Sequence, residues 1–459
     1  MSSFYNKYRA HYGDNLTLAI PVVISQLGHT LVQTADVIII GHFAGTISLA
    51  AVSLANSIFM VPLIIGIGIS YGSTPLIAQH NGRKQFAECG QLLSNSLFIN
   101  VLTGIILFGL VCLGSVYFLD QLHQSPDVLK LAKPFLMLLA LSVIPMLVFN
   151  TFKQFAEGLG FTKQAMMISI WGNVLNILLG VTFVKGLFGI HPMGMMGVGY
   201  STLIDRCLMA TVMGFYVFRS KHFKEYLKGF ALKNIDRIRS LSILKIGAPV
   251  ALQYTFEISA FSAAAIIIGT MGALQLAGHQ IALSMASMTY MMASGLSAAA
   301  AIKSGNYFGA KDHGTLRLSA NASYHIVLVF MTLTALIFTF GNHLLPWIYT
   351  SDKMVIPIAA QLLILAAVFQ LFDGAQVVGL GILRGMGDVN IPTVITFLAY
   401  WVVGLPVGYV LGITLNLGIN GVWYGLVLGL AVSAILLYFR FKIISKHHRD
   451  KQDIIIARD

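Results

Sequence analysis

The chain has 459 residues, of which 57% are hydrophobic and only 10% are charged. Soluble proteins carry roughly 25% charged residues, so this composition excludes an ordinary soluble domain and indicates an integral membrane protein. Lysine and arginine outnumber the acids by 29 to 17. The basic residues lie at the ends of apolar stretches, which a bilayer surface explains better than a nucleic acid does. We therefore expect the lipid bilayer as a partner, and no nucleic acid.

Apolar stretches of roughly 20 residues can cross a bilayer as helices, and this sequence contains about a dozen. Proline, glycine or charge marks most of the breaks between them. No removable signal peptide is expected in the polar start that ends at Asp14. The predicted fold is an all-α integral membrane protein with about twelve transmembrane helices. They cover residues 15–41, 48–79, 88–119, 130–155, 163–189, 194–218, 244–271, 275–305, 317–349, 354–383, 391–415 and 419–443.

The second half of the sequence repeats the first. Pro21 recurs as Pro249, an offset of 228 (249 − 21), and Glu157-Gly158 recurs as Arg384-Gly385, an offset of 227 (384 − 157). Such a duplication in an apolar chain predicts two homologous six-helix lobes, a pattern typical of transporters. We expect an N-terminal lobe over 1–218, a basic linker over 219–243, a C-terminal lobe over 244–445 and a tail over 446–459.

Basic residues mark alternate connections between the predicted helices. One set includes Lys84, Lys163 and the segment 219–245, whereas the opposite connections carry only Lys130, Lys185 and Lys353. The positive-inside rule then places both termini in the cytoplasm, with the chain in the plasma (inner) membrane. Aromatic and aliphatic residues alternate with basic ones in 219–245, which fits an amphipathic interfacial helix and equally a solvated linker.

Three acids stand out inside predicted helices: Asp36, Glu257 and Asp373. Acids inside a membrane are costly and usually functional, although polar contacts between helices also explain some of them. None has a lysine or arginine nearby in its own helix. Each should therefore be protonated, bind a cation or pair across helices.

Polar neighbours accompany these acids. Gln26, His29, Gln33 and Asp36 follow one another at steps of three, four and three residues, so they form one stripe of a helix. His29 either helps Asp36 to titrate or is a hydrogen-bonded packing residue. Further candidates for cavity contacts are Asn173, Asn176, Tyr254, Gln280 and Gln376.

The acids suggest two kinds of site. Glu257 and Asp373 could supply hard oxygen ligands to Na⁺, whereas Asp36 is better suited to take up a proton. Asp205 and Arg206 are expected to form a structural ion pair. No cofactor is expected, and the coupling ion is Na⁺ or H⁺.

The sequence gives little support for an enzyme. Gly68-Ile69-Ser70-Tyr71-Gly72 matches the G-x-S-x-G pattern of serine hydrolases, but it lies within a predicted span without a strand–turn–helix context. Close helix packing explains its glycines better. The sequence has neither a phosphate-binding G-x-x-x-x-G-K-[ST] loop nor H-E-x-x-H. The cysteines Cys89, Cys112 and Cys207 fit no metal motif.

Over essentially its whole length the chain resembles the multidrug and toxic compound extrusion (MATE) transporters of the NorM-like branch. The residues that carry this resemblance are Pro21, Pro249 and the segments Ala301–Lys311, Glu157–Lys163 and Gln376–Gly385. The resemblance implies two six-helix lobes around a cavity that opens alternately to each side. It also implies a cation site at Glu257 and Asp373, and a coupling role for Asp36. Phe369 stands where the branch often has tyrosine, which removes one hydroxyl from that site.

These observations predict a secondary antiporter that exports organic, often cationic and amphiphilic compounds as a monomer. One alternative is a flippase for a lipid-linked saccharide, which would need a cavity lined by lysine or arginine, and few basic residues lie inside the predicted spans. A membrane scaffold or receptor is a second alternative, but it would need neither buried acids nor an internal duplication. The transported compounds and the choice between Na⁺ and H⁺ stay open.

Overall fold

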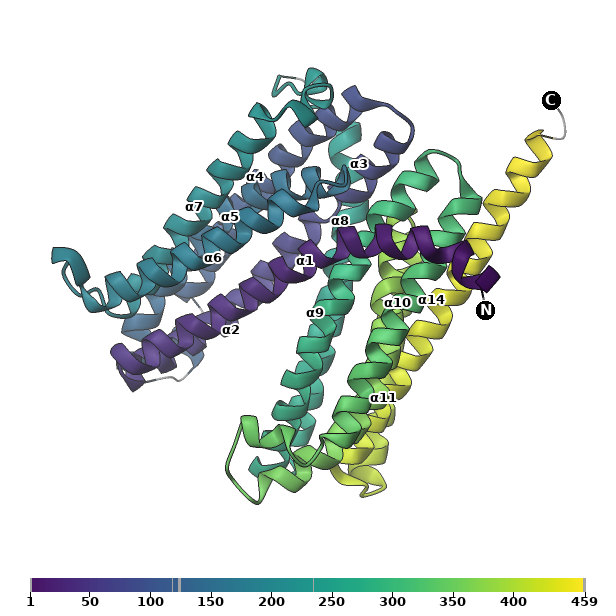
Figure 1. The fold of residues 1–459 in the computed structure, drawn as a ribbon. Coiled ribbons are helices and arrows are strands. Elements are labelled where there is room, and N and C mark those ends of the chain that lie inside the picture. The colour runs from purple at the N-terminus through teal and green to yellow at the C-terminus, as the bar shows by residue number, and fades with distance from the viewer. Residues whose placement is uncertain (1, 118, 123–124, 234, 457–459) are drawn as a thin grey trace. The chain divides into compact units, whose positions relative to one another are not determined.

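The computed structural model describes residues 2–117, 119–122, 125–233 and 235–456, and the predicted tail 446–459 therefore ends outside the described residues. All regular elements of these residues are helical (Figure 1), which confirms the predicted all-α class. The α-helices are α1 (Ser2–Phe43), α2 (Thr46–Ser70), α3 (Ser73–Gly82), α4 (Phe86–Tyr117), α5 (Pro126–Gly158), α6 (Thr162–Lys185), α7 (Met195–Arg219), α8 (Arg237–Gly269), α9 (Ala273–Gly309), α10 (His313–Phe340), α11 (Val355–Gly385), α12 (Asn390–Phe397), α13 (Leu405–Tyr409) and α14 (Gly418–Ile456).

Twelve helical segments of the described residues are long and apolar enough to cross a membrane, as predicted. One segment, Thr46–Gly82, joins α2 and α3. Another, Asn390–Thr414, joins α12 and α13 with the π-helical stretches η6 (Leu398–Gly404) and η7 (Val410–Thr414). Most helix ends differ from the predictions by a few residues. The first helix begins well before the predicted residue 15, because apolar character marks the lipid whereas helical hydrogen bonding continues through polar residues.

The chain folds into two compact units. Unit 2 is Ile24–Ala251, and unit 1 combines Met1–Val23 with Leu252–Asp459. Both α1 and α8 therefore pass from one unit to the other in mid-helix. The two crossing points are equivalent in the repeat, because Ala251 follows Val23 by 228 residues (251 − 23). The start of α1 therefore belongs to unit 1, and the start of α8 belongs to unit 2. The predicted lobes, 1–218 and 244–445, do not include this exchange.

In unit 2, α5 is the central helix. It packs against α2, α4 and α7, and its Phe135, Leu136 and Phe155 are fully buried. The helix combines many apolar residues with proline at Pro134 and Pro145, and it continues through both. Since α5 also contacts α3 and α6, the polar side chains near its end are held against several helices at once.

In unit 1, α11 takes the corresponding place. It packs against α9, α10 and α14. The start of α1 is held by Asn15, which is fully buried and donates from Nδ2 to Ser319 O at 3.0 Å and to Ser323 Oγ at 2.9 Å, both on α10. A buried amide with its hydrogen bonds made fixes the position of the helix that carries it.

The connection between α7 and α8 is built differently from the predicted interfacial helix. It contains two short 3₁₀ turns, η3 (Lys221–Phe223) and η4 (Tyr226–Gly229), and no α-helix within its described residues. The aromatic residues Phe223 and Tyr226 point into unit 2, where Phe223 is fully buried. Of the two alternatives left open for this segment, the interfacial helix is therefore wrong for the part that precedes α8.

Candidate functional site

Unit 1 holds the first candidate site. Glu257 on α8 and Asp373 on α11 are 6% and 3% exposed, respectively. Their carboxyl groups are close enough to interact electrostatically, and the Arg384 guanidinium also acts on Glu257. The tertiary structure therefore brings together two acids that are 116 residues apart (373 − 257). Two buried carboxyl groups that interact in this way are not both ionised unless a cation binds near them; otherwise at least one of them takes up a proton.

Aromatic hydroxyl groups surround this pair. Tyr290 on α9 and Tyr400 on η6 both interact electrostatically with the two carboxyl groups. Tyr400 Oη donates to Gln376 Oε1 at 2.9 Å, and Gln376 Nε2 has no hydrogen-bond partner among the described residues. Gln376 was predicted from the sequence as a cavity contact, but Tyr290 and Tyr400 were not. Tyr400 could not be placed from a helical pattern, because a π-helix changes which residues share a face.

Other predicted members of this site lie elsewhere or contact different groups. Phe369 packs against Phe261 and Trp423, with ring centroids 5.9 and 5.6 Å apart, so it belongs to the apolar core. Tyr254 lies beside Arg384, whose Cζ is 5.8 Å from the ring centroid. Gln280 is exposed, and no hydrogen bond within the described part of the chain ties it to the acids. The cavity contacts expected of Tyr254 and Gln280 thus stay predictions.

Unit 2 holds the second candidate site, around Asp36 on α1. One carboxyl oxygen of Asp36, Oδ1, is buried with no hydrogen-bond partner among the described residues. Arg206 and Asp205, both on α7, act electrostatically on this carboxyl group. A buried oxygen without a partner is costly, so it marks a place where a proton or a ligand is stabilised.

The expected Asp205–Arg206 ion pair is not among the ion pairs of the described residues, although the two charges do interact electrostatically. Arg206 Nη1 instead donates to Ser142 Oγ on α5 at 2.6 Å. Asp205 faces α6, where a Cβ added to Gly172 would lie 2.8 Å from Asp205 Oδ1. Consecutive residues of a helix point about 100° apart, which is why these two reach different neighbours.

The two predicted asparagines of α6 border the same region. Asn176 Nδ2 donates to Thr202 Oγ1 at 3.5 Å, and Asn176 Oδ1 and Asn173 Nδ2 have no partner among the described residues. Helix α1 approaches α6 closely here, because a Cβ on Gly28 would lie 2.5 Å from Asn173 Nδ2. Asp36, Asn173 and Asn176, which were singled out from the sequence, therefore lie in one polar region between α1 and α6.

The remaining members of the predicted α1 stripe differ in environment. Gln33 is exposed, whereas His29 is half-buried and within electrostatic reach of Lys153 and Arg206. Lys153 was missed: its Nζ lies 3.9 Å from Glu157 Oε1 and 3.3 Å from Ser25 Oγ, and both charged side chains are buried. The signal was available in the sequence, since Lys153 and Glu157 are an i,i+4 pair at the end of the predicted span 130–155.

The G-x-S-x-G stretch packs helices together, as the sequence analysis favoured. A Cβ on Gly68 would lie 2.4 Å from Ala251 Cα, and one on Gly72 would lie 2.4 Å from Ile243 O. Ser70 Oγ donates to Gly66 O at 3.0 Å and to Asn100 Oδ1 at 2.8 Å. Both glycines thus allow backbone contact with α8, and the serine hydroxyl serves helix contacts.

No group of three or more His, Cys, Asp and Glu side chains that could hold a metal ion occurs among the described residues. The Glu257–Asp373 pair falls below that number. Carbonyl, amide and hydroxyl oxygens would have to complete the shell of any bound cation.

Comparison with known proteins agrees with the duplication. The model of the MatE family matches twice, at residues 21–182 and 249–410, and the second match begins 228 residues after the first (249 − 21). The chain is 30% identical to the "Probable multidrug resistance protein NorM" of Xylella fastidiosa (strain 9a5c) over 449 residues, which covers 97% of this chain and 95% of the relative. It is 33% identical over 449 residues to the "Multidrug resistance protein MdtK" of Yersinia pseudotuberculosis serotype O:1b (strain IP 31758), covering 96% and 97%.

Solved structures show the same fold. The eukaryotic MATE transporter AtDTX14 aligns with a TM-score of 0.85 at 20% identity, over 97% of this chain and 99% of that one. A structure described as MATE in the straight conformation aligns with a TM-score of 0.88 at 20% identity, over 96% and 97%. The chain therefore belongs to the MatE family as a NorM-like member, and it is a membrane transporter rather than an enzyme.

Proposed function

We propose that this chain is a secondary active exporter of small organic compounds, often cationic and amphiphilic, which it exchanges for Na⁺ or H⁺ by alternating access. In this proposal Glu257 and Asp373 bind Na⁺ and Asp36 takes up H⁺. A single chain is the transporting unit, in the plasma (inner) membrane with both termini in the cytoplasm. The names of the relatives, which are multidrug resistance proteins, support multidrug export.

The observation that carries the proposal is the placement of carboxyl groups inside membrane-spanning helices. Glu257 and Asp373 lie beside one another in unit 1, and Asp36 has a buried oxygen without a partner among the described residues. Ionisable groups at this depth are retained for ion or substrate binding.

Coupling follows from competition for the same negative charge. An organic cation is held well only while the carboxyl groups are charged and unoccupied. Binding of Na⁺ or a proton then lowers the affinity for that cation, and the coupling is reciprocal. An inward ion gradient therefore drives the organic cation outward.

Efflux from vesicles that contain the purified protein tests the proposal. A fluorescent organic cation is followed under an imposed sodium gradient, and then under an imposed pH gradient. We expect Asp36→Asn to slow transport driven by the pH gradient, and Glu257→Gln and Asp373→Asn to slow transport driven by sodium. A charge-assisted contact contributes about 1.5–3 kcal/mol, so each loss should be roughly 10- to 150-fold.

Asp127→Asn is the matched control, because Asp127 is an exposed acid in the first turn of α5. It should leave both rates unchanged. Wild-type rates for all three site variants under both gradients would refute the proposal.

The lipid-linked saccharide flippase is kept as a second candidate because the few basic residues inside the spans include buried ones. Lys153, Arg206 and Arg384 are basic residues inside membrane-spanning helices, and Lys153 and Arg384 are buried. A diphosphate headgroup needs such positive charges. If the protein moves no organic cation but flips a short-chain diphosphate-linked sugar, and Lys153→Gln with Arg206→Gln abolishes this activity, then the second candidate is correct.

A further inference from the structure

The connection between α7 and α8 is fastened to the end of unit 2 by hydrogen bonds. Tyr226 Oη donates to Asn81 Oδ1 at 2.9 Å, Ala231 N donates to Ser94 Oγ at 3.0 Å, and Asp236 N donates to Asn95 Oδ1 at 2.8 Å. The acceptors lie on α3 and α4, far from the connection in sequence. A loop bound in this way along its length has a defined backbone position.

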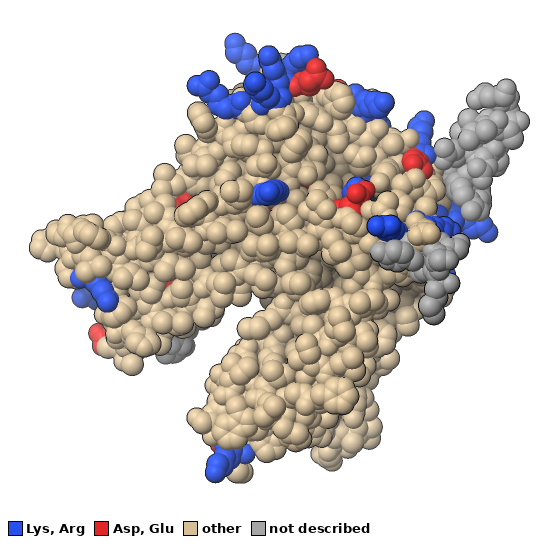
Figure 2. Space-filling model, in the orientation of Figure 1, with Lys and Arg blue, Asp and Glu red and all other residues tan. Residues whose placement is uncertain are grey.

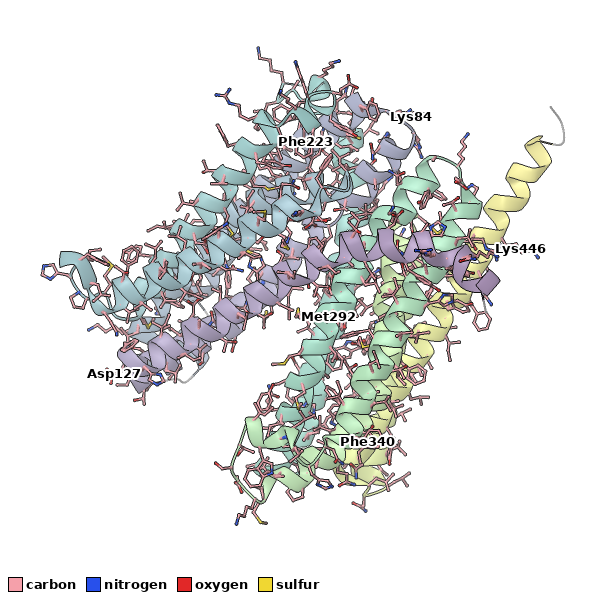
Figure 3. All side chains as sticks on the ribbon, viewed as in Figure 1. Lys84, Asp127, Phe223, Met292, Phe340 and Lys446 are labelled. Atoms are coloured by element: carbon pink, nitrogen blue, oxygen red, sulfur yellow. The ribbon has the colours of Figure 1, made fainter. Side chains whose placement is uncertain are left out.

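Close packing reinforces these bonds. A Cβ on Gly229 would collide with Ala87 O, and one on Gly90 would collide with Tyr226 O, so the connection lies directly on α4. Phe223 is fully buried, with ring centroids 5.7 Å from Phe155 and 5.1 Å from Phe161. Figure 3 shows Phe223 inside this end of unit 2 and Lys84 near it. The α3–α4, α5–α6 and α7–α8 connections therefore meet at one end of the unit.

The outward side of this connection is basic. Lys221, Lys224, Lys228, Lys233 and Arg237 are all exposed; they are called the linker cations below. Figure 2 shows Lys and Arg gathered at this end of unit 2. Neighbouring acids offset only part of this charge. Glu225 lies 3.7 Å from Lys228, whereas Glu88 and Asp236 are paired with Arg239 at 3.0 and 3.1 Å.

Apolar side chains stand out from the same stretch. Leu232, Ile235 and Ile238 are 57%, 40% and 74% exposed, and Lys233 and Arg237 lie among them in the sequence. Exposed aliphatic groups are unfavourable in water but favourable at the boundary between headgroups and acyl chains. The connection joins the ends of two helices that are long and apolar enough to cross a membrane, so it lies on the side of the membrane where both helices end.

We propose that this surface binds anionic phospholipids, with the linker cations on the headgroup phosphates and Leu232, Ile235 and Ile238 among the upper acyl chains. The leaflet is the one at the linker end of unit 2. A cluster of basic residues next to a membrane-spanning helix attracts anionic lipid, and a fixed backbone presents these charges without the entropy cost of ordering a loop. Charge and apolar exposure together distinguish the surface from a solvated loop, which needs no exposed isoleucines.

Lipid retention tests the charged part of the proposal. The full-length protein is reconstituted in nanodiscs of equal parts phosphatidylcholine and phosphatidylglycerol, and its bound lipids are counted by native mass spectrometry. The wild type should retain phosphatidylglycerol preferentially. Lys233→Gln with Arg237→Gln should lower the ratio of retained phosphatidylglycerol to phosphatidylcholine several-fold.

The charge-matched control is Lys130→Gln with Lys185→Gln, which removes two exposed lysines near helix ends of unit 2, in α5 and at the end of α6. The control should keep the wild-type ratio. No lipid preference in the wild type, or equal ratios for the two double variants, would overturn the proposal. All four side chains face outward, so size-exclusion profiles should show that both variants are folded.

Fluorescence quenching tests the apolar part. A bimane label on Ile238→Cys should be quenched by nitroxide-labelled lipids and little by aqueous iodide, whereas a label on Lys228→Cys should be reached by iodide. Quenching of the Ile238→Cys label by iodide alone would exclude acyl-chain contact. Neither measurement depends on transport, so failure of the lipid-binding proposal can be distinguished from failure of the proposed exporter function.

Discussion

At the scale of single residues, the environment of each acid depends on other helices. Asp36 has no basic neighbour in its own helix, yet Arg206 of α7 acts on it. Glu257 similarly meets Arg384 of α11. Residue type and helical position identified the acids correctly as unusual, but they could not supply these partners. The protonation chemistry of a buried acid is set by all the helices that surround it.

Tyr226 allows a pH-dependent test outside the membrane-spanning segments. Burial raises the pKa of this phenol above its ordinary value of 10.0, with smaller contributions from Cys89 and Glu225. Its hydrogen bond to Asn81 should make the wild type more stable than Tyr226→Phe by about 0.5–1.5 kcal/mol near neutral pH. Because the unfolded state loses this proton first, the difference is complete below pH 10 and declines as pH rises through the folded-state pKa.

Unfolding in detergent micelles at several pH values measures that difference. Comparing the two proteins at each pH cancels the titration of all other groups. A difference that stays constant well above pH 10 would show that the Tyr226 hydroxyl is not held as described.

At the scale of elements, the eleventh and twelfth spans meet through glycine. Gly404, Gly408 and Gly412 face the glycines of α14, and a Cβ on Gly425 would lie 2.3 Å from Gly408 N. The four-residue spacing is visible in the sequence and is typical of close helix pairs. The π-helical stretches η6 and η7 beside these glycines are not visible, because they depend on how the backbone adapts to its neighbour.

Gly425→Ala should destabilise this pair of helices. The new methyl group would meet backbone atoms that cannot rotate away, so we expect a loss of about 1–3 kcal/mol in the free energy of unfolding. Gly109→Ala in α4 is the control, since a Cβ there has nothing within 4 Å. The control should be neutral or slightly stabilising, because alanine favours a helix over glycine by about 1 kcal/mol. Thermal unfolding of both variants measures these effects. Equal unfolding temperatures for Gly425→Ala and Gly109→Ala would contradict the close contact at Gly425.

At the scale of the whole molecule, the two halves share a scaffold but differ in charge. The family model matches both halves, yet the residue that aligns with Glu257 is His29 (257 − 228 = 29), and Arg384 aligns with Glu157 (384 − 227 = 157). Unit 2 accordingly buries Lys153 with Glu157, whereas unit 1 buries Glu257 with Asp373. The duplication supplied the architecture, and divergence within it gave the two units different buried charged residues.

The proposed sidedness rests on the pattern of basic connections and can be checked directly. In a variant without its native cysteines, Lys228→Cys should react with a membrane-impermeant maleimide only after cells are permeabilised. Lys185→Cys, at the other end of α6 from Lys163, should react in intact cells. Labelling of both from the same side would refute the alternating arrangement of spans.

The sequence by itself determined the twelve spans, the duplication and the membrane acids, because hydropathy, repeat offsets and charge inside apolar runs are local properties. It also placed Asn173 and Asn176 on the helix that meets α1. Only the tertiary structure decided which carboxyl groups meet, where Arg206 points and how the α7–α8 connection is fastened. It also decided that α1 and α8 cross between the units after Val23 and Ala251. These features depend on side-chain contacts between helices far apart in the chain, which no local pattern of apolar and polar residues specifies.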